Sequence, residues 1–215
     1  MPRQEVDKDL IVITGFSRPI PDAVKDLQHM RNFVKALTAE VSFASQRIIL
    51  GCPQDRGQKH PSDIIDFIKD TTPKTGRDRI TVGLSLGGLL ALGVECERVR
   101  SGEQLGHLVL VDSPLNPNVE VNPPPDGRFD GFSEQYRHRV ATASRCMAIL
   151  RELPESELSK IITIGTAQDD IVPPEAKHLP IEHIGHHELP SDIKGHRLSP
   201  EKIQAVIKIM LGRII

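Results

Sequence analysis

The chain has 215 residues and a formal net charge of −2, from 27 basic and 29 acidic residues. This near balance gives no electrostatic reason to expect a nucleic-acid partner or an anionic membrane surface. Aromatic residues make up 3% of the chain and Trp is absent, which argues against a platform for stacking nucleic-acid bases. The length suits one domain, residues 1–215, with one sizeable core.

The cysteines and the N-terminal segment bear on the cellular compartment. Cys52, Cys96 and Cys146 are far apart in the sequence and form no C-x-x-C pair. This pattern favours a reducing compartment and argues against a zinc site or a disulfide framework. The first residues are charged and lack the apolar centre of a signal peptide, and no apolar run reaches membrane-spanning length. We therefore expect a cytoplasmic protein without a membrane span.

Short apolar runs alternate with amphipathic segments along the chain. Runs with the character of buried parallel strands occupy residues 10–14, 47–51, 80–83, 108–112 and 161–165, and a weaker sixth lies within 180–189. Apolar residues with helical spacing lie between these runs, from Asp22 to about Val41, over 62–69, from the third run to about Arg100, and over 132–153. Alternating strands and helices predict an α/β fold with right-handed crossovers and a mostly parallel sheet of about six strands, covered by helices on both faces.

The end of the chain carries the clearest helix start. Ser199 is expected to be the N-cap of the last helix, with Pro200 at its first position. The apolar face of this helix is then formed by four residues at helical spacing: Ile203, Val206, Ile207 and Met210.

The stretch Gly83-Leu84-Ser85-Leu86-Gly87 joins the third predicted strand to an apolar helix. The glycines two residues from Ser85 are small enough to let strand and helix pass closely around a strained turn, and Gly88 gives further room. This G-x-S-x-G stretch resembles the nucleophile elbow of the α/β-hydrolase superfamily, which includes esterases, lipases and thioesterases. The resemblance implies that Ser85 is a catalytic nucleophile; the alternative is a serine that simply fits the start of the helix.

The resemblance also carries expectations about the sheet. The usual sheet of the superfamily has eight strands, and this chain opens on what would be the third. We therefore expect the first two family strands to be missing, as in the smallest lipases and esterases of the superfamily. The catalytic residues of the family occur in the order serine, acid, histidine along the chain.

The acid of the resemblance falls in the turn after the fifth predicted strand. The sequence Asp169-Asp170-Ile171-Val172-Pro173 matches the family pattern Asp-x-(Ile/Val)-Val-Pro with Asp169 as the acid. A carboxylate is needed there to hold the imidazole in one tautomer and to stabilise its positive charge. In this register the side chain of Asp170 is expected to point away from the histidine, although the sequence leaves Asp170 open as the acid.

The base of the resemblance is His196, in a Gly-His pair just before the last helix. His183, His186 and His187 are competitors in or beside the weak sixth strand. Their spacing matches no metal-binding motif that we can justify, so we interpret these three as solvated or strand-edge residues. No metal and no organic cofactor is expected.

Two backbone N–H groups are expected to hold the oxyanion. One belongs to Leu86, the residue after the nucleophile, where the helix N-terminus adds its dipole. By resemblance the other belongs to Phe16, in the loop after the first strand. Thr14-Gly15-Phe16 replaces the His-Gly-x that is frequent in the family, which keeps the donor but changes the residues that support the loop.

The segment Ser113 to Tyr136 lies where relatives carry lids. Its possible pocket walls are Leu115, Phe129, Phe132 and Tyr136, and its region offers Arg128, Arg137 and Arg139 as possible anion contacts, although a plain surface loop explains the arginines as well. We expect a serine hydrolase that cleaves a small-molecule carboxylic ester or thioester through an acyl-enzyme. The alternatives are a non-catalytic binding protein of the same fold and an acyltransferase that uses the same residues.

Overall fold

The structure is a computed structural model that describes residues 4–14, 20–50, 65–66, 68–70, 72, 78–121 and 132–215; within these ranges the side chains at 20–26, 50 and 132–137 are not described. Its strands are β1 (Gln4–Thr14), β2 (Val41–Leu50), β3 (Asp78–Leu84), β4 (His107–Val111), β5 (Ile161–Gly165) and β6 (Gly185–Glu188). Its helices are α1 (Ile20–Glu40), α3 (Leu86–Arg100), α4 (Phe132–Leu150), α5 (Glu155–Leu158) and α6 (Pro200–Arg213), with a 3-10 turn, η1, at Pro174–Ala176.

The six strands form one sheet in the order β2-β1-β3-β4-β5-β6. Every neighbouring pair in it is parallel. The carboxyl ends of all six strands therefore meet at one edge of the sheet. The prediction of a parallel sheet of about six strands is confirmed, and so is the weak sixth strand, which is β6 at the sheet edge.

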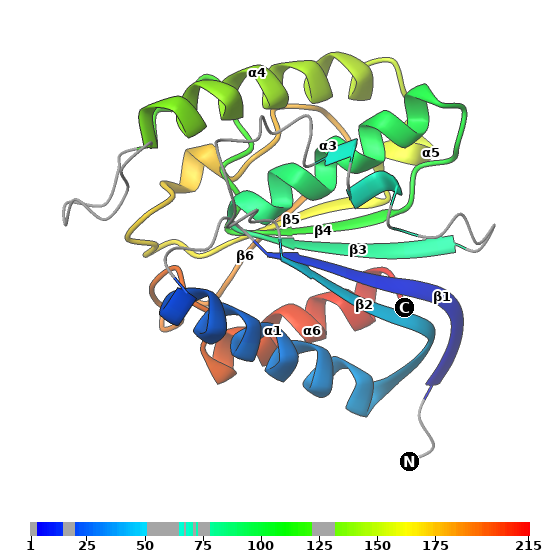
Figure 1. Ribbon diagram of the computed structural model, residues 1–215, viewed down its shortest axis with the longest axis vertical. Coiled ribbons are helices and arrows are strands. Elements are labelled where there is room, and N and C mark those ends of the chain that lie inside the picture. Colours follow the sequence, from blue (N-terminus) through cyan, green and yellow to red (C-terminus); the bar gives the residue numbers. More distant parts are fainter. Residues whose placement is uncertain are drawn as a thin grey trace.

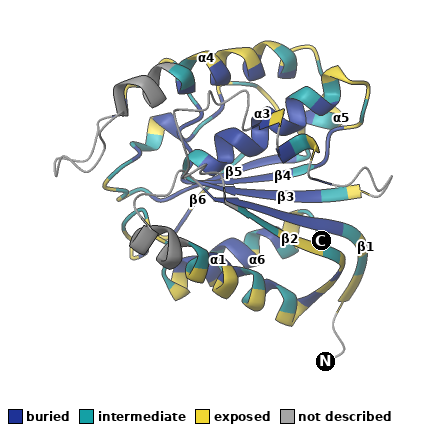
Figure 2. Cartoon of the chain, in the orientation of Figure 1, coloured by how far each residue is buried: buried dark blue, intermediate teal, exposed yellow. Residues whose placement is uncertain are grey.

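Helices cover both faces of this sheet (Figure 1). Helices α1 and α6 pack on one face, where Met30, Phe33 and Met210 join strand residues in one core cluster. Helices α3 and α4 cover the other face and share a second cluster with the strands. Strands β3, β4 and β5 and helix α3 are almost entirely buried, whereas α4 exposes its outer side (Figure 2). None of the helices in the described ranges is both long and apolar enough to cross a bilayer.

The first two strands are longer than the sequence predicted. β1 begins at Gln4, six residues before its apolar run, and its polar start is paired with the start of β2. Val41 begins β2 and does not end the preceding helix. Val41 and Phe43 are buried and alternate with exposed residues, so this half-buried strand lacks the continuous apolar run used to find the others.

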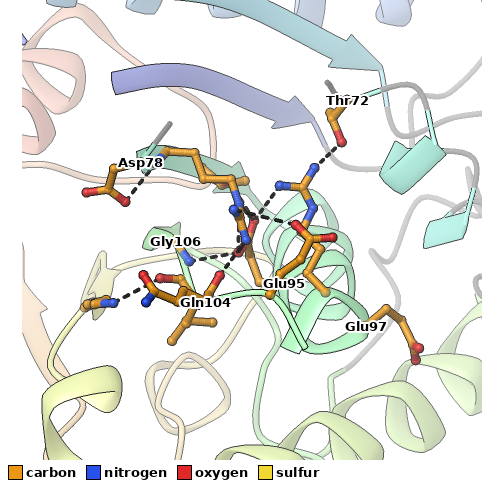
Figure 3. Close-up of polar contacts among 12 residues, drawn as sticks. Thr72, Asp78, Glu95, Glu97, Gln104 and Gly106 are labelled. Carbon is orange, nitrogen blue, oxygen red and sulfur yellow. Dashed lines mark hydrogen bonds and ion pairs between the residues drawn. The ribbon is translucent and has the colours of Figure 1, made fainter. Parts of the chain in front are cut away.

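A buried charged cluster ties α3 to the amino ends of the strands (Figure 3). Glu95 is completely buried in α3 and accepts bonds from Arg79 Nη2 at 2.7 Å and from the backbone N–H of Gly106 at 3.0 Å. Arg98 lies one turn further along α3, 3.8 Å from Glu95, and donates to the Thr72 hydroxyl. These five residues, which we call the Glu95 cluster, hold the far end of the helix that begins after Ser85.

Candidate active site

Ser85 occupies the sharp turn between β3 and α3. Its backbone has φ 53° and ψ −133°, a left-handed conformation that costs free energy for any residue other than glycine. Its N–H donates to Val111 O at 2.9 Å, which ties the turn to the end of β4. The side chain is partly exposed. The strained strand-turn-helix expected from the sequence is therefore present.

The glycines of this turn are required by close approach. A Cβ atom on Gly83 would lie 2.4 Å from Gly88 Cα, so strand and helix touch through their backbones. A Cβ on Gly87 would lie 2.3 Å from the carbonyl carbon of Thr14. The start of α3 is thus pressed against the end of β1.

Leu86 is the first residue of α3. Its position leaves its N–H without an acceptor inside the helix, and the positive end of the helix dipole adds to its attraction for an anion. Phe16, the other predicted oxyanion donor, follows β1 but lies outside the described residues.

His196 lies in the loop before α6 and is paired with Asp169. Its Nδ1 is 2.9 Å from Asp169 Oδ2 and 3.1 Å from Oδ1. The Asp169 side chain is fully buried, and the His196 side chain is 12% exposed. A neutral ring that donates from Nδ1 carries its lone pair on Nε2, which is the arrangement of a general base.

Hydrogen bonds and a nearby charge stabilise the ionised form of the Asp169 carboxylate. Burial by itself would raise the pKa of Asp169, but the bond and charge of His196 and the N–H groups of Ile171 (2.8 Å) and Val172 (3.1 Å) hold that pKa well below its usual range. Asp169 is therefore ionised at neutral pH.

Asp170 contacts a different part of the same histidine. It is exposed, and its Oδ1 accepts a bond from the backbone N–H of His196 at 3.0 Å. The expectation that its side chain points away from the histidine was wrong, because it binds the main chain of His196. The ring itself is paired with Asp169.

A second buried carboxylate lies beside this pair. Asp112 follows β4 with φ 45° and accepts from the N–H and the hydroxyl of Thr166 at 2.7 and 2.9 Å. Two buried lysines also reach it: Lys177 Nζ at 3.2 Å and Lys202 Nζ at 2.8 Å. Lys177 Nζ lies 3.0 Å from Asp169 as well. We call Asp112, Asp169, Lys177, Lys202 and His196 the Asp112 cluster.

Within the described part of the chain, three residues of this cluster have the geometry to hold a metal. Asp112, Asp169 and His196 offer atoms within 4.8 Å of one another. The ammonium groups of Lys177 and Lys202 already lie against the oxygens of the two carboxylates. Because these cations compensate the negative charge, we assign no metal to the cluster.

Ser85 and His196 are not joined directly in the described part of the structure. Among the described residues, no hydrogen bond joins the Ser85 hydroxyl to the His196 ring. Catalytic hydrogen bonds are often long before substrate binds, so this geometry does not remove either residue as a candidate.

The competing histidines lie around β6. His183 is exposed and 3.2 Å from Glu155. His186 Nδ1 forms a hydrogen bond with the Thr163 hydroxyl at 2.7 Å, and the His186 ring stacks on that of His178. Burial, followed by the nearby charges of His178 and His187, lowers the pKa of His186 to about 4. His178 and His186 line a cavity of about 390 Å³, and neither Ser85 nor His196 lines it.

Two residues proposed as a pocket wall and an anion contact near the segment after β4 have packing roles instead. Leu115 is fully buried in the core on the α3 side of the sheet, so it is not a pocket wall. Arg139 is buried and donates to the carbonyl oxygens of Pro114, Asn116 and Val119, so it fastens this segment to α4. Arg128 and Phe129 lie outside the described residues, as do the side chains of Phe132, Tyr136 and Arg137.

The members of the cluster that sequence reasoning missed are the two lysines. Lys202 lies four residues before Val206, on the apolar face of α6, where a lysine is unusual. That position was a usable signal. Lys177 carries no such local signal, because its partner Asp112 lies on another strand end.

Comparison with solved structures identifies the fold. A meta-cleavage product hydrolase from Pseudomonas fluorescens is 15% identical, with TM-score 0.62 and coverage of 98% of this chain and 91% of that one. The RedJ thioesterase of the prodiginine pathway in Streptomyces coelicolor is 15% identical, with TM-score 0.54 and coverage of 97% and 88%. A monoacylglycerol lipase from Paleococcus ferrophilus is 12% identical, with TM-score 0.55 and coverage of 98% and 97%. The chain has the α/β-hydrolase fold. No protein-family model and no curated protein sequence matches it.

Proposed function

We propose that this protein is a serine hydrolase that cleaves a small carboxylic ester or thioester through an acyl-enzyme. The observation that supports this most is the buried pair of Asp169 and His196, which lies at the same sheet edge as the strained Ser85. A general base fixed by an ionised carboxylate and a serine at a helix N-terminus are what acyl transfer needs.

In the proposed mechanism the Ser85 oxygen attacks the carbonyl carbon of the substrate while His196 Nε2 takes the hydroxyl proton. Asp169 holds Nδ1–H and stabilises the imidazolium that forms. The N–H groups of Leu86 and Phe16 stabilise the oxyanion. His196 then gives the proton to the leaving alcohol or thiol. Water, deprotonated by the same ring, then attacks the acyl carbon. The bond between this carbon and the Ser85 oxygen breaks, the ring returns the proton to that oxygen, and the acid leaves.

The substrate class rests on the structural relatives. The matched structures include proteins named as a thioesterase, a monoacylglycerol lipase and a hydrolase of meta-cleavage products. Two of these names refer to acyl-oxygen or acyl-sulfur cleavage, which is chemistry that a serine nucleophile performs. These names support ester and thioester substrates as the substrate class of the proposal.

A fluorophosphonate probe tests the proposal. Wild-type protein is expected to form a stable adduct that mass spectrometry maps to Ser85, and Ser85→Ala is expected to form none. Ser156→Ala is the matched control, because Ser156 is exposed on α5 and lies far along the chain from the elbow. An adduct on another residue, or folded wild-type protein that does not react, contradicts the serine hydrolase.

One observation favours a second function. Because no described hydrogen bond joins Ser85 to His196, a binding protein that retains the fold without turnover is the alternative. It predicts a folded protein that neither reacts with the fluorophosphonate nor releases p-nitrophenol from p-nitrophenyl esters. A rapid Ser85 adduct therefore rejects it.

A further inference from the structure

The Asp112 cluster forms a closed circuit of contacts. Lys177 joins Asp169 to Asp112, and Lys202 joins Asp112 to the carbonyl oxygen of Gly195. Gly195 precedes His196, whose ring returns to Asp169. The circuit therefore links the ends of β4 and β5 to the histidine loop and the first turn of α6.

The two lysines are in costly positions. The side chains of Lys177 and Lys202 are 1% and 0% exposed. Lys202 also lies in the first turn of α6, where the positive end of the helix dipole repels a cation. Removing two ammonium groups from water stabilises a fold poorly even when they are paired. The cost of burying these two lysines therefore suggests that they have a role other than stabilising the fold.

The charges of the circuit balance while the His196 ring is neutral. Two carboxylates, Asp112 and Asp169, face two ammonium groups. A proton on His196 adds one uncompensated positive charge to a cluster that is almost fully buried. Lys177 is the lysine closest to this event, because its Nζ and His196 Nδ1 approach the same oxygen, Asp169 Oδ2, at 3.0 and 2.9 Å.

We propose that Lys177 is a positioning residue of the candidate active site, whose ammonium group immobilises the Asp169 carboxylate and draws part of its charge away from the His196 ring. The proposal rests on the proposed function, since it concerns the proton that His196 would take from Ser85. Lys177 Nζ also donates to Thr166 O at 2.5 Å, so its three acceptors fix it in place.

The charged groups that face His196 come from every described element around it. They are Asp169 and Asp170 after β5, Asp112 after β4, Lys177 after η1 and Lys202 on α6. Lys177 is the cation in contact with the carboxylate that the ring uses. Replacing it with a neutral side chain removes a positive charge near the ring and leaves both carboxylates, so the protonated ring is favoured.

The test is an NMR titration of the His196 ring in the full chain, with His196→Gln identifying the signal by its loss. In Lys177→Met the midpoint pH of that signal is expected to rise by about one unit relative to wild type. The acid limb of kcat/KM for a p-nitrophenyl ester is expected to rise by the same amount, with KM unchanged. Lys208→Met, an exposed lysine on α6, is expected to move neither.

A second variant covers the case in which Lys177→Met does not fold. Lys177→Gln keeps an N–H donor for both carboxylates and removes only the charge, so a rise in the same direction is expected. A midpoint that stays in place or falls in the folded variant overturns the proposal, because a purely structural lysine would change the melting temperature and leave the midpoint unchanged. If the midpoint rises but wild-type protein shows no turnover and no fluorophosphonate adduct, the charge effect of Lys177 stands and the proposed hydrolase fails.

Discussion

Two buried charged clusters lie at opposite ends of the same sheet. The Glu95 cluster lies at the amino ends of β3 and β4, and the Asp112 cluster lies beyond the carboxyl ends of β4 and β5. Both place carboxylates and cations where water is excluded. In the Glu95 cluster the carboxylate accepts from two arginine nitrogens and a backbone N–H, and both arginines have further partners, Gln104 O and Thr72.

The difference lies in what each cluster leaves for a ligand. In the Glu95 cluster the charged groups are paired with one another and with neighbouring polar groups of the protein, so we assign it the role of holding α3 in place. The Asp112 cluster ends at His196, whose ring uses Nδ1 for Asp169 and retains Nε2 for another partner. Similar buried ion pairs can thus fix a helix at one end of a sheet and prepare a base at the other. Variants of the two clusters should separate these roles.

The largest expected effect is on turnover, at Asp169. Asp169→Asn is expected to lower kcat by about 10³- to 10⁴-fold with little change in KM, because the amide no longer enforces the Nδ1–H tautomer. The measurement is steady-state hydrolysis of a p-nitrophenyl ester, well below the melting temperature of the variant.

Asp170→Asn is the matched control for that prediction. Its amide oxygen can still accept from the backbone N–H of His196, so turnover close to wild type is expected. If Asp170→Asn is the severe variant, Asp170 supports the histidine. If both variants are mild, the acid lies elsewhere, and Asp112 is the remaining buried carboxylate of the cluster.

The next effect is on stability, at Glu95. Glu95→Gln leaves the buried Arg98 and the partly buried Arg79 without their carboxylate, and it is expected to lower the free energy of unfolding by about 3 kcal/mol. Urea denaturation measures this loss. The folded fraction is expected to keep the wild-type kcat, because the cluster lies at the far end of α3.

Glu97→Gln provides the comparison on the same helix. Glu97 pairs with Arg100 and Arg145 at the surface, so a loss of at most about 1 kcal/mol is expected. If Glu95→Gln lowers kcat as strongly as Asp169→Asn does, the division of roles between the two clusters is wrong.

A smaller effect is expected at His186, a half-buried titratable group outside both clusters. Its pKa, lowered by burial to about 4, is below the value of about 6.5 for an unfolded histidine. Between these values the unfolded chain binds more protons, so stability is lost as the pH falls from about 6.5 towards 4.

His186→Gln is expected to remove part of this pH dependence, and to leave turnover unchanged. Because the ring is only half-buried and solvent screens part of the effect, the loss removed is expected to be about 1 kcal/mol across the window. Urea denaturation at several pH values measures it. His183→Gln, at an exposed site, should retain the wild-type slope. An unchanged slope in His186→Gln would show that another group causes the loss.

The parts of this molecule that the sequence predicted are those with local signals. The turn at Ser85, the position of Asp169 after β5 and the capped start of α6 each depend on a few neighbouring residues. Ser199 Oγ accepts from Lys202 N at 3.2 Å, as its place before Pro200 predicted.

The parts that it did not predict depend on contacts between distant segments. Lys202 contacts Asp112, which lies 90 residues earlier in the chain. No sequence pattern near either residue predicts that the two are in contact. The half-buried start of β2 was not predicted for a related reason. Its alternation of buried and exposed residues indicates a strand only when the neighbouring strand is known.

Ser85 is proposed to attack the substrate carbonyl carbon with His196 as its general base. This step can be trapped by mixing the protein with p-nitrophenyl acetate, quenching with acid during turnover, and mapping the acetyl group by mass spectrometry. We expect an acetyl group on Ser85 in wild-type protein and none in His196→Gln quenched at the same time. Turnover without an acetyl group on Ser85, or equally fast acetylation of His196→Gln, would contradict it.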